Sequence, residues 1–283
     1  MSLGVLNNIS AIYAQNNLNQ TQMSLQSTLQ QLSSGSRINS GADDAAGLAL
    51  ADGLHANVAA LTQSAQNANS GVGMLQAADG ALAQVTNLLD RAVTLATEAS
   101  NGTLNSNQVS SANQEYQNIL TEIGNIGSTT NYNGNKLFTS TAVNIVVSDG
   151  TTAGTTTFAE TIGVLSKSSV GTVGAAAAGQ DLTTNATLSA TTATAILNAL
   201  TTAVGDVAYQ RGSIGANINQ LSAAQNVANA QQVNLSSAEN DIRATNYGQA
   251  TSDMAKFQIL SQTGIAALSQ ANSVQQDVLK LLQ

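Results

Sequence analysis

Residues 57–99 place apolar side chains in alternating steps of three and four residues, without a slip, for more than five heptads. Only Asp79 and Thr86 are polar in this series, which runs Val58, Leu61, Ala65, Ala68, Val72, Leu75, Asp79, Leu82, Thr86, Leu89, Val93 and Ala96. Such spacing puts one apolar stripe along one face of an α-helix, as in coiled coils. With a rise of 1.5 Å per residue, it predicts a helical rod of about 60 Å.

Further helices are predicted on either side of the middle of the chain. Asn101-Gly102 is expected to end the first rod, and a helix over about 107–126, with Ile119 and Ile123 inward, to fold back on it. From about residue 191 helix resumes, and a second series steps by four and three residues through Leu200, Val204, Val207, Arg211, Ile214, Ile218, Leu221, Gln225, Ala228, Gln232 and Leu235. Proline, which interrupts helix interiors, is absent from the chain.

The two ends of the chain are predicted to be helices with very few charged side chains. Residues 3–33 contain none, and the last helix, over about 240–282, has few. A surface helix normally keeps a charged face toward water, so we expect the two ends to pair and other copies of the chain to cover them. A head-to-tail contact that does not close makes a helical fibre. The residues expected to pack between subunits are Leu18, Leu25, Leu29, Leu32, Phe257, Leu260, Val274, Val278 and Leu281.

The middle of the chain has a different pattern. Residues 142–147 are predicted to form a strand, Asp149-Gly150 a hairpin turn, and residues 155–165 the partner strand. Residues 166–190 are rich in Gly, Ala, Ser and Thr and have little core-forming power, so we expect surface loops there. The fold class predicted is mainly α, with long antiparallel coiled-coil-like rods formed by both chain ends and a small β-hairpin region in the middle.

Three structural parts follow from this pattern. Residues 1–44 with 240–283 form a terminal helical domain, residues 45–140 with 191–239 form a rod-like helical bundle, and residues 141–190 form a small β-hairpin and loop surface region. An ordinary helical bundle that folds alone is the alternative to assembly, and the uncharged end helices argue against it.

The chain has too few histidine and cysteine side chains for most kinds of enzyme site. The chain has one histidine, His55, and no cysteine, so a zinc site with two histidines is excluded. Asp43 and Asp44 are adjacent and diverge in direction, so we interpret them as N-cap and first-turn acids of a helix rather than a metal pair. We predict no catalytic residue, no metal site and no cofactor, and a chain that is not an enzyme.

Charge and hydropathy restrict the partners. The net charge is -8 and the eight Lys and Arg never cluster, which argues against nucleic acid. No run approaches the ~18 apolar residues of a membrane span, so no membrane insertion is expected. The first residues have no basic segment followed by an apolar core, which predicts either a cytoplasmic chain or export without a secretory signal.

Several segments resemble bacterial flagellins. Residues 32–48 (LSSGSRINSGADDAAGL) are similar to the family's N-terminal signature, and residues 131–138 (NYNGNKLF) to the turn after its second helix. Residues 211–217 (RGSIGAN) and 240–247 (NDIRATNY) are similar to C-terminal flagellin segments. The positions taken as the family signature are Arg37, Asn39, Asp43, Asp44, Asn133, Gly134, Arg211, Gly215, Arg243 and Asn272.

The resemblance implies a structural subunit of the bacterial flagellar filament, in a minimal form without large outer domains. Such a subunit is exported unfolded through the flagellar type III channel, is secreted to the extracellular flagellum, and assembles into a helical tube that acts as a propeller for swimming. The partners implied are many copies of the chain, an export chaperone, and the hook-associated and cap proteins. The alternatives are a hook-filament junction protein and a secreted flagellin-like adhesin or receptor ligand.

The resemblance also implies a possible contact with an animal receptor. In some flagellins, Toll-like receptors bind the first rod, and the matching positions here resemble Arg91 and Leu95, with Glu122 on the second helix. The alternative is that these side chains pack against neighbouring subunits in a filament.

Overall fold

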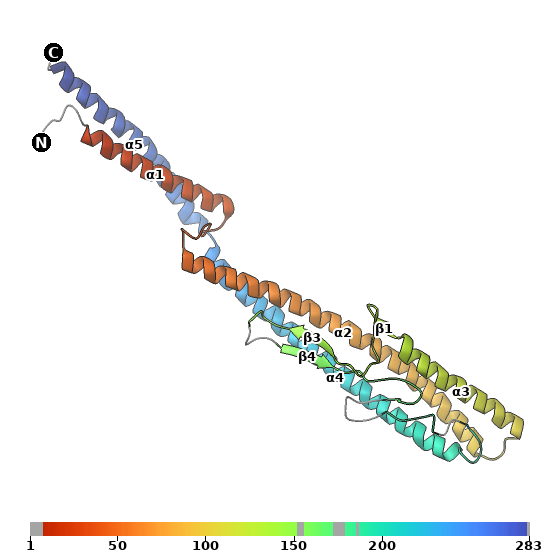
Figure 1. Cartoon of the computed structure of the whole chain (residues 1–283). Helices are drawn as coiled ribbons and strands as arrows, with labels where there is room; N and C mark the ends of the chain where they lie inside the picture. Colours follow the sequence, from red (N-terminus) through yellow and green to blue (C-terminus); the bar gives the residue numbers. More distant parts are fainter. Residues whose placement is uncertain (1–7, 152–155, 172–178, 185–186, 282–283) are drawn as a thin grey trace. The chain divides into compact units, whose positions relative to one another are not determined.

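The computed structural model describes residues 8–151, 156–171, 179–184 and 187–281, and within the last helix it excludes the side chains of residues 275 and 277–281. Its helices are α1 (Ile9–Ser34), α2 (Ala45–Ser100), α3 (Ser106–Thr129), α4 (Ala193–Arg243) and α5 (Tyr247–Leu281) (Figure 1). Its strands are β1 (Asn131–Tyr132), β2 (Asn135–Lys136), β3 (Val143–Val147) and β4 (Thr156–Glu160). The predicted fold class, mainly α with a small β-hairpin region, is confirmed.

The chain divides into two compact units. The smaller unit comprises Met1–Ala56 and Asn234–Gln283, and the larger comprises Asn57–Val233. The smaller unit therefore holds α1, α5, the start of α2 and the end of α4, whereas the larger holds α3, the four strands and the remainder of α2 and α4. The boundaries of the three parts predicted from the sequence stay a prediction.

In the larger unit, α2 buries a broader face than the predicted stripe. One half of the predicted series is fully buried, namely Leu61, Leu75, Leu82 and Leu89 with Ala68 and Ala96. The other half, which includes Val58, Ala65 and Val72, is only half-buried. A second buried series lies three residues after the first, at Ser64, Gly71, Ala78, Val85, Ala92 and Ala99. The face is broad because α2 contacts several elements and not one partner helix.

Helix α4 runs antiparallel to α2 in the larger unit. A side chain added at Gly71 would lie 3.1 Å from Leu221, and farther along α2 the Asp79 carboxylate binds the Arg211 guanidinium at 2.8 Å. The predicted series on α4 is confirmed at its fully buried positions, Leu200, Val207, Ile214, Leu221 and Ala228.

The β3–β4 hairpin packs on α2. Its register pairs Ile145 with Phe158, and the buried Ile145 side chain lies directly over Gly71, where a larger residue would overlap it. The Ser64 hydroxyl donates to the carbonyl of Ser148 at 2.5 Å and accepts from the Ser148 N–H at 2.8 Å. The hairpin is thus held to the rod by both apolar and polar contacts.

The expectation that residues 166–190 contribute little to a core is wrong for the described part of that segment. Val170, Leu182 and Leu188 are almost completely buried in the same core as the rods. The Asn113 side chain of α3 accepts a hydrogen bond of 2.7 Å from the Leu188 N–H. These apolar residues are scattered among small ones and show no period, so only tertiary packing reveals their role. Residues 172–178 and 185–186 lie outside the description.

The last helix predicted over about 240–282 is confirmed for residues 247–281, but its predicted start is wrong. Helix α4 continues to Arg243, residues 244–246 are not helical, and α5 begins at Tyr247. Asn246 caps the start of α5, because its side-chain oxygen accepts a hydrogen bond from the Gln249 N–H at 3.3 Å.

None of the described helices is long and apolar enough to cross a membrane.

Two glycines three residues apart in α3 allow a direct test of this packing. A methyl group at Gly127 would overlap the backbone carbonyl of Leu165, whereas one at Gly124 would meet open space. Gly127→Ala should destabilise the chain by about 1–3 kcal/mol, as overpacking does. Gly124→Ala should stabilise it by up to about 1 kcal/mol, because alanine favours helix. Thermal unfolding followed by circular dichroism measures both, and equal effects of the two changes would contradict the packing.

Candidate assembly interface

Helices α1 and α5 form an antiparallel pair (Figure 1). At one end, the Asn8 side chain donates to the carbonyl of Ala271 at 2.9 Å. In the middle, a side chain added at Gly264 would lie 3.2 Å from Leu18, and at the other end one added at Gly35 would lie 2.9 Å from the Tyr247 hydroxyl. The first helix of the chain is therefore matched along its whole described length by the last.

Both helices have less exposed side chains at heptad spacing, in register with each other. On α1 these are Ala11, Ala14, Leu18, Thr21, Leu25, Thr28 and Leu32, and on α5 Ala250, Met254, Phe257, Ser261, Gly264, Leu268 and Ala271. Because Leu18 faces Gly264, the antiparallel register sets Leu25 opposite Phe257 and Leu32 opposite Ala250. Four of the residues predicted to pack between subunits, Leu18, Leu25, Leu32 and Phe257, thus lie between the two ends of one chain.

The remaining large apolar side chains of the pair face outward. Of the predicted packing residues, Leu29 is 46% exposed, Leu260 42% and Val274 50%, while the side chains of Val278 and Leu281 lie outside the description. The sequence reasoning missed seven further residues of the two helices that are more than half exposed: Ile9, Ile12, Tyr13, Met23, Tyr247, Ile259 and Ile265. Ile9, Ile12 and Tyr13 fall within one turn, a signal that a search restricted to the leucine repeat passed over.

The α1–α5 pair therefore has two apolar surfaces. The inner surface is covered because the two helices pack on each other, and the outer surface is exposed. Helix α1 carries no charged side chain at all, so its outer face consists of apolar residues separated by Asn, Gln, Ser and Thr. A face of this kind is typical of a protein interaction site rather than of a solvated helix.

Two loops connect this pair to the other helices, and we call them the junction loops (residues 35–44 and 244–246). Gly35 ends α1 in the left-handed conformation, with φ at 70°, which glycine adopts without strain. The loops then pair as a short antiparallel bridge: the Arg37 N–H donates to the Arg243 carbonyl at 2.7 Å and the Thr245 N–H to the Gly35 carbonyl at 3.1 Å. This bridge fixes where α1 ends relative to where α5 begins.

The two adjacent aspartates of the first junction loop have different roles. One Asp43 oxygen accepts from the Asn39 N–H at 3.0 Å and from the Ser40 N–H at 2.8 Å, and these bonds to the charged form lower the pKa of the carboxyl. Asp44 accepts from the Gly47 N–H at 2.9 Å and caps α2. The helix-start interpretation is confirmed for Asp44 and wrong for Asp43, which closes the loop before the helix.

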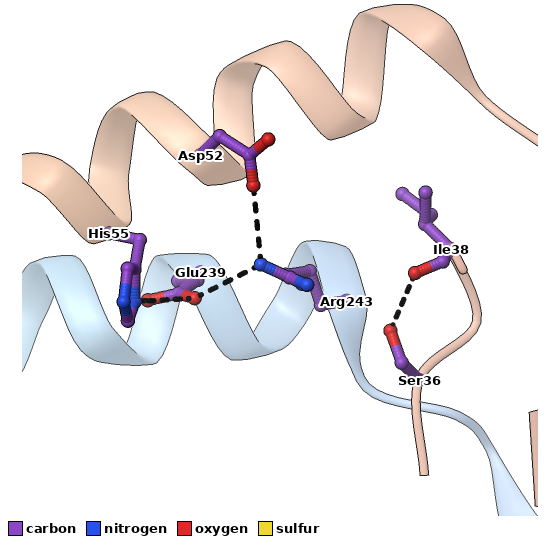
Figure 2. Close-up of polar contacts among 6 residues, drawn as sticks. All are labelled: Ser36, Ile38, Asp52, His55, Glu239 and Arg243. Carbon is purple, nitrogen blue, oxygen red and sulfur yellow. Dashed lines mark hydrogen bonds and ion pairs between the residues drawn. The ribbon is translucent and has the colours of Figure 1, made fainter. Parts of the chain in front are cut away.

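Four charged or titratable side chains lie beside the loops in the smaller unit (Figure 2). The Arg243 guanidinium on α4 lies 3.4 Å from Asp52 of α2 and 3.7 Å from Glu239. The same Glu239 carboxylate lies 3.2 Å from the His55 ring. Ion pairs this exposed contribute little to stability, so they mainly orient α2 against α4. The described residues contain no group of three or more potential acidic, histidine or cysteine metal ligands.

The structure brings together only part of the predicted family signature. Arg37, Asn39, Asp43 and Asp44 lie in the first junction loop, with Arg243 paired to it across the bridge.

The other signature residues lie elsewhere. Asn133 and Gly134 both have positive φ, 51° and 81°, as the tight turn between β1 and β2 requires. Arg211 pairs with Asp79 on α2, and Asn272 is exposed on α5. Nothing in the structure explains Gly215, which faces open space.

Comparison with known proteins identifies the family. Residues 5–142 match the bacterial flagellin N-terminal helical region, and residues 197–282 match the bacterial flagellin C-terminal helical region. The chain is 32% identical over 278 residues to a flagellin of Halalkalibacterium halodurans, with 98% of each chain covered. The chain belongs to the bacterial flagellin family. The resemblance noted in the sequence is confirmed.

Other flagellar proteins are similar over all or part of the chain. The flagellar filament 33 kDa core protein of Treponema phagedenis is 31% identical over 281 residues, covering 98% of both chains. The crystal structure of Bacillus cereus flagellin is 27% identical, with a TM-score of 0.48, covering 62% of this chain and 94% of that one.

The three residues that the flagellin resemblance associates with an animal receptor differ in accessibility. Arg91 is exposed and forms a two-point ion pair with Glu115 of α3, at 2.6 and 3.0 Å. This partner was missed in the sequence. Glu122 is exposed and accepts from the Asn125 side chain at 3.2 Å. Leu95, by contrast, is only 2% exposed, so within this chain it packs in the core and not at the surface.

The junction loop predicts a specific acid titration. Because the Asp43 pKa is lowered from 3.8 by hydrogen bonds to its charged form, the stabilising effect of the carboxylate is present above 3.8 and is lost as pH falls through the lowered pKa. The amide proton NMR shifts of Asn39 and Ser40 should titrate with a midpoint below 3.8. Asp43→Asn should abolish that titration, whereas Asp44→Asn, which keeps a capping side chain, should leave it intact. A midpoint above 3.8 would contradict the loop geometry.

Proposed function

We propose that this chain is the structural subunit of the bacterial flagellar filament and assembles through the outer surface of its α1–α5 pair. The observation that supports this most directly is the charge-free α1, whose inner face already packs on α5 while Ile9, Ile12, Tyr13 and Met23 face outward. The family and the name of the Treponema phagedenis filament core protein agree with this assignment.

The geometry of the pair favours an open polymer. The outward apolar residues occur on both helices and on more than one side: Ile12 and Met23 lie opposite the inner face of α1, and Leu260 and Ile265 lie on different flanks of α5. One neighbour cannot cover all of these sides, so each pair needs several neighbours. Contacts between unlike surfaces of identical subunits that do not close on themselves generate a helical filament.

In this proposal the chain is a structural protein, and its principal partners are other copies of itself. We infer that it is exported unfolded through the flagellar type III channel to the extracellular flagellum, and that an export chaperone, the hook-associated proteins and the cap protein handle it on the way. A chain without proline and cysteine supports this route, because neither isomerisation nor disulfide chemistry delays folding after export.

The length of the chain fits a minimal filament subunit. The match with the Halalkalibacterium halodurans flagellin spans 98% of both chains, and between α3 and α4 the described residues hold only two small hairpins as regular structure. We infer a thin filament whose surface is formed by the rods and the β3–β4 hairpin. No catalytic role is proposed for any side chain.

Receptor binding stays a prediction, and for Leu95 it would require a change in packing. Arg91 and Glu122 are accessible on α2 and α3, but Leu95 could reach a partner only if the packing between these helices opened. The arrangement gives no support to the junction-protein or adhesin alternatives.

A comparison of inner-face and outer-face variants tests the assembly. Ile12→Gln combined with Met23→Gln changes exposed residues only, so the unfolding free energy should stay within about 0.5 kcal/mol of the parent. Filaments should nevertheless be absent in electron micrographs of the purified, seeded protein, because the neighbours lose their apolar contact.

The matched control changes the inner face. Leu25→Ala removes a leucine opposite Phe257. Because Leu25 is only half-buried, the change should lower the stability of the α1–α5 pair by about 1–2 kcal/mol, less than the loss of a fully buried leucine, as measured by unfolding of the monomer. Normal filaments from the outer-face double variant would contradict the proposed interface, as would normal filaments from a chain lacking residues 1–33.

A further inference from the structure

The end of strand β4 is held to helix α4 by two neutral amides. Glu160, the last residue of β4, is 8% exposed, and its carboxylate accepts a hydrogen bond from the side-chain amide of Asn217. Two residues farther along, the Ile162 carbonyl accepts from the side-chain amide of Gln210, which is 4% exposed. Gln210 and Asn217 are seven residues apart, and so lie two turns apart on one face of α4.

Among the described contacts, the Glu160 carboxylate forms no ion pair with a basic side chain. Strand β3, which pairs with β4 through Val143, has no charged residue. Between Asp206 and Glu239, α4 carries only Arg211, and between His55 and Asp90, α2 carries only Asp79.

Those two charges bind each other at 2.8 Å, which leaves the amide of Asn217 as the partner of the Glu160 carboxylate among the described contacts. Burial raises the pKa of Glu160 above its ordinary value, and the hydrogen bond from Asn217 lowers it by less. Burying an ionised carboxylate that has one neutral hydrogen-bond donor costs more free energy than burying its protonated form.

We propose that the β3–β4 hairpin is a pH-responsive element that attaches more firmly to α4 when Glu160 is protonated than when it is ionised. The other described polar contacts of the hairpin and of the residues just after β4 involve neutral groups. On α2, Ser64 binds the backbone of Ser148 and the Asn67 side chain donates to the Val146 carbonyl at 3.1 Å. On α4, the Gln210 amide donates to the Ile162 carbonyl.

The direction of the effect follows from proton linkage. Opening the hairpin returns Glu160 to water, where its pKa is the ordinary 4.5. The stability that the protonated side chain confers is fully present below 4.5 and is lost as pH rises through the raised pKa of the closed form. Because one proton is involved, the opening equilibrium rises by at most about tenfold per pH unit within that window and is flat on either side.

Amide hydrogen exchange on the full chain measures the opening directly. For Val143–Val147 and Thr156–Glu160, exchange corrected for the intrinsic rate should increase between pH 4.5 and 7.5 in the parent protein. Glu160→Gln keeps the shape and an acceptor for Asn217, so its hairpin should show no such pH dependence. Asn217→Ala removes the bond that favours the ionised form, and should make the rise larger than in the parent.

Three other groups serve as controls. Asp149, in the turn of the same hairpin, has its pKa lowered by hydrogen bonds from Thr151, and therefore stays ionised throughout the window. Glu122→Gln changes an exposed acid on α3, and His55→Gln changes the chain's one histidine, which belongs to the smaller unit. Both variants should keep the pH response of the parent. The proposal is overturned if Glu160→Gln responds to pH like the parent, or if hairpin protection decreases as pH falls.

Discussion

The antiparallel pairing of α1 with α5 is the contact on which the other features of the smaller unit depend. It joins residues as distant in sequence as Asn8 and Ala271, and it covers the face of α1 that carries Leu18, Leu25 and Leu32. An isolated helix of this kind, without charges and with many Asn and Gln, would be marginal in water. Once α1 is paired, its outer face presents apolar and uncharged polar side chains to neighbouring molecules. Such a face suits a filament built from identical subunits.

The junction loops set the register of that pair. The bridge between Arg37 and Arg243, the left-handed Gly35 and the loop closed by Asp43 are each modest contacts. Together they fix the end of α1 against the beginning of α5, and with heptad spacing one fixed point determines every later contact. A one-residue shift would move Phe257 away from Leu25 and leave both more exposed than they are in this register. This accounts for the clustering of four signature residues in the first junction loop, with Arg243 paired to it from the end of α4.

The larger unit reaches high burial with small side chains. Most members of the buried series of α2 that begins at Ser64 are Gly or Ala, and at Gly71 both the β3–β4 hairpin, through Ile145, and α4, through Leu221, approach closely. Polar groups then supply much of the specificity, through Ser64, Gln210 and Asn217. One consequence is the buried carboxylate of Glu160, whose described partner is the neutral amide of Asn217. The proposed pH response of the hairpin depends on this contact.

The sequence by itself determined the helices, their period and the family, because heptad spacing and cap residues such as Asp44 are local and need no partner to be recognised. It could not determine which apolar face meets which element. Leu25 and Leu29 belong to the same repeat, yet one packs on α5 and the other faces outward, since the phase of a helix is set by the antiparallel register and not by its own residues. Likewise, Leu182, Leu188 and Glu160 belong to no local sequence pattern. Their burial depends on tertiary packing between distant parts of the chain.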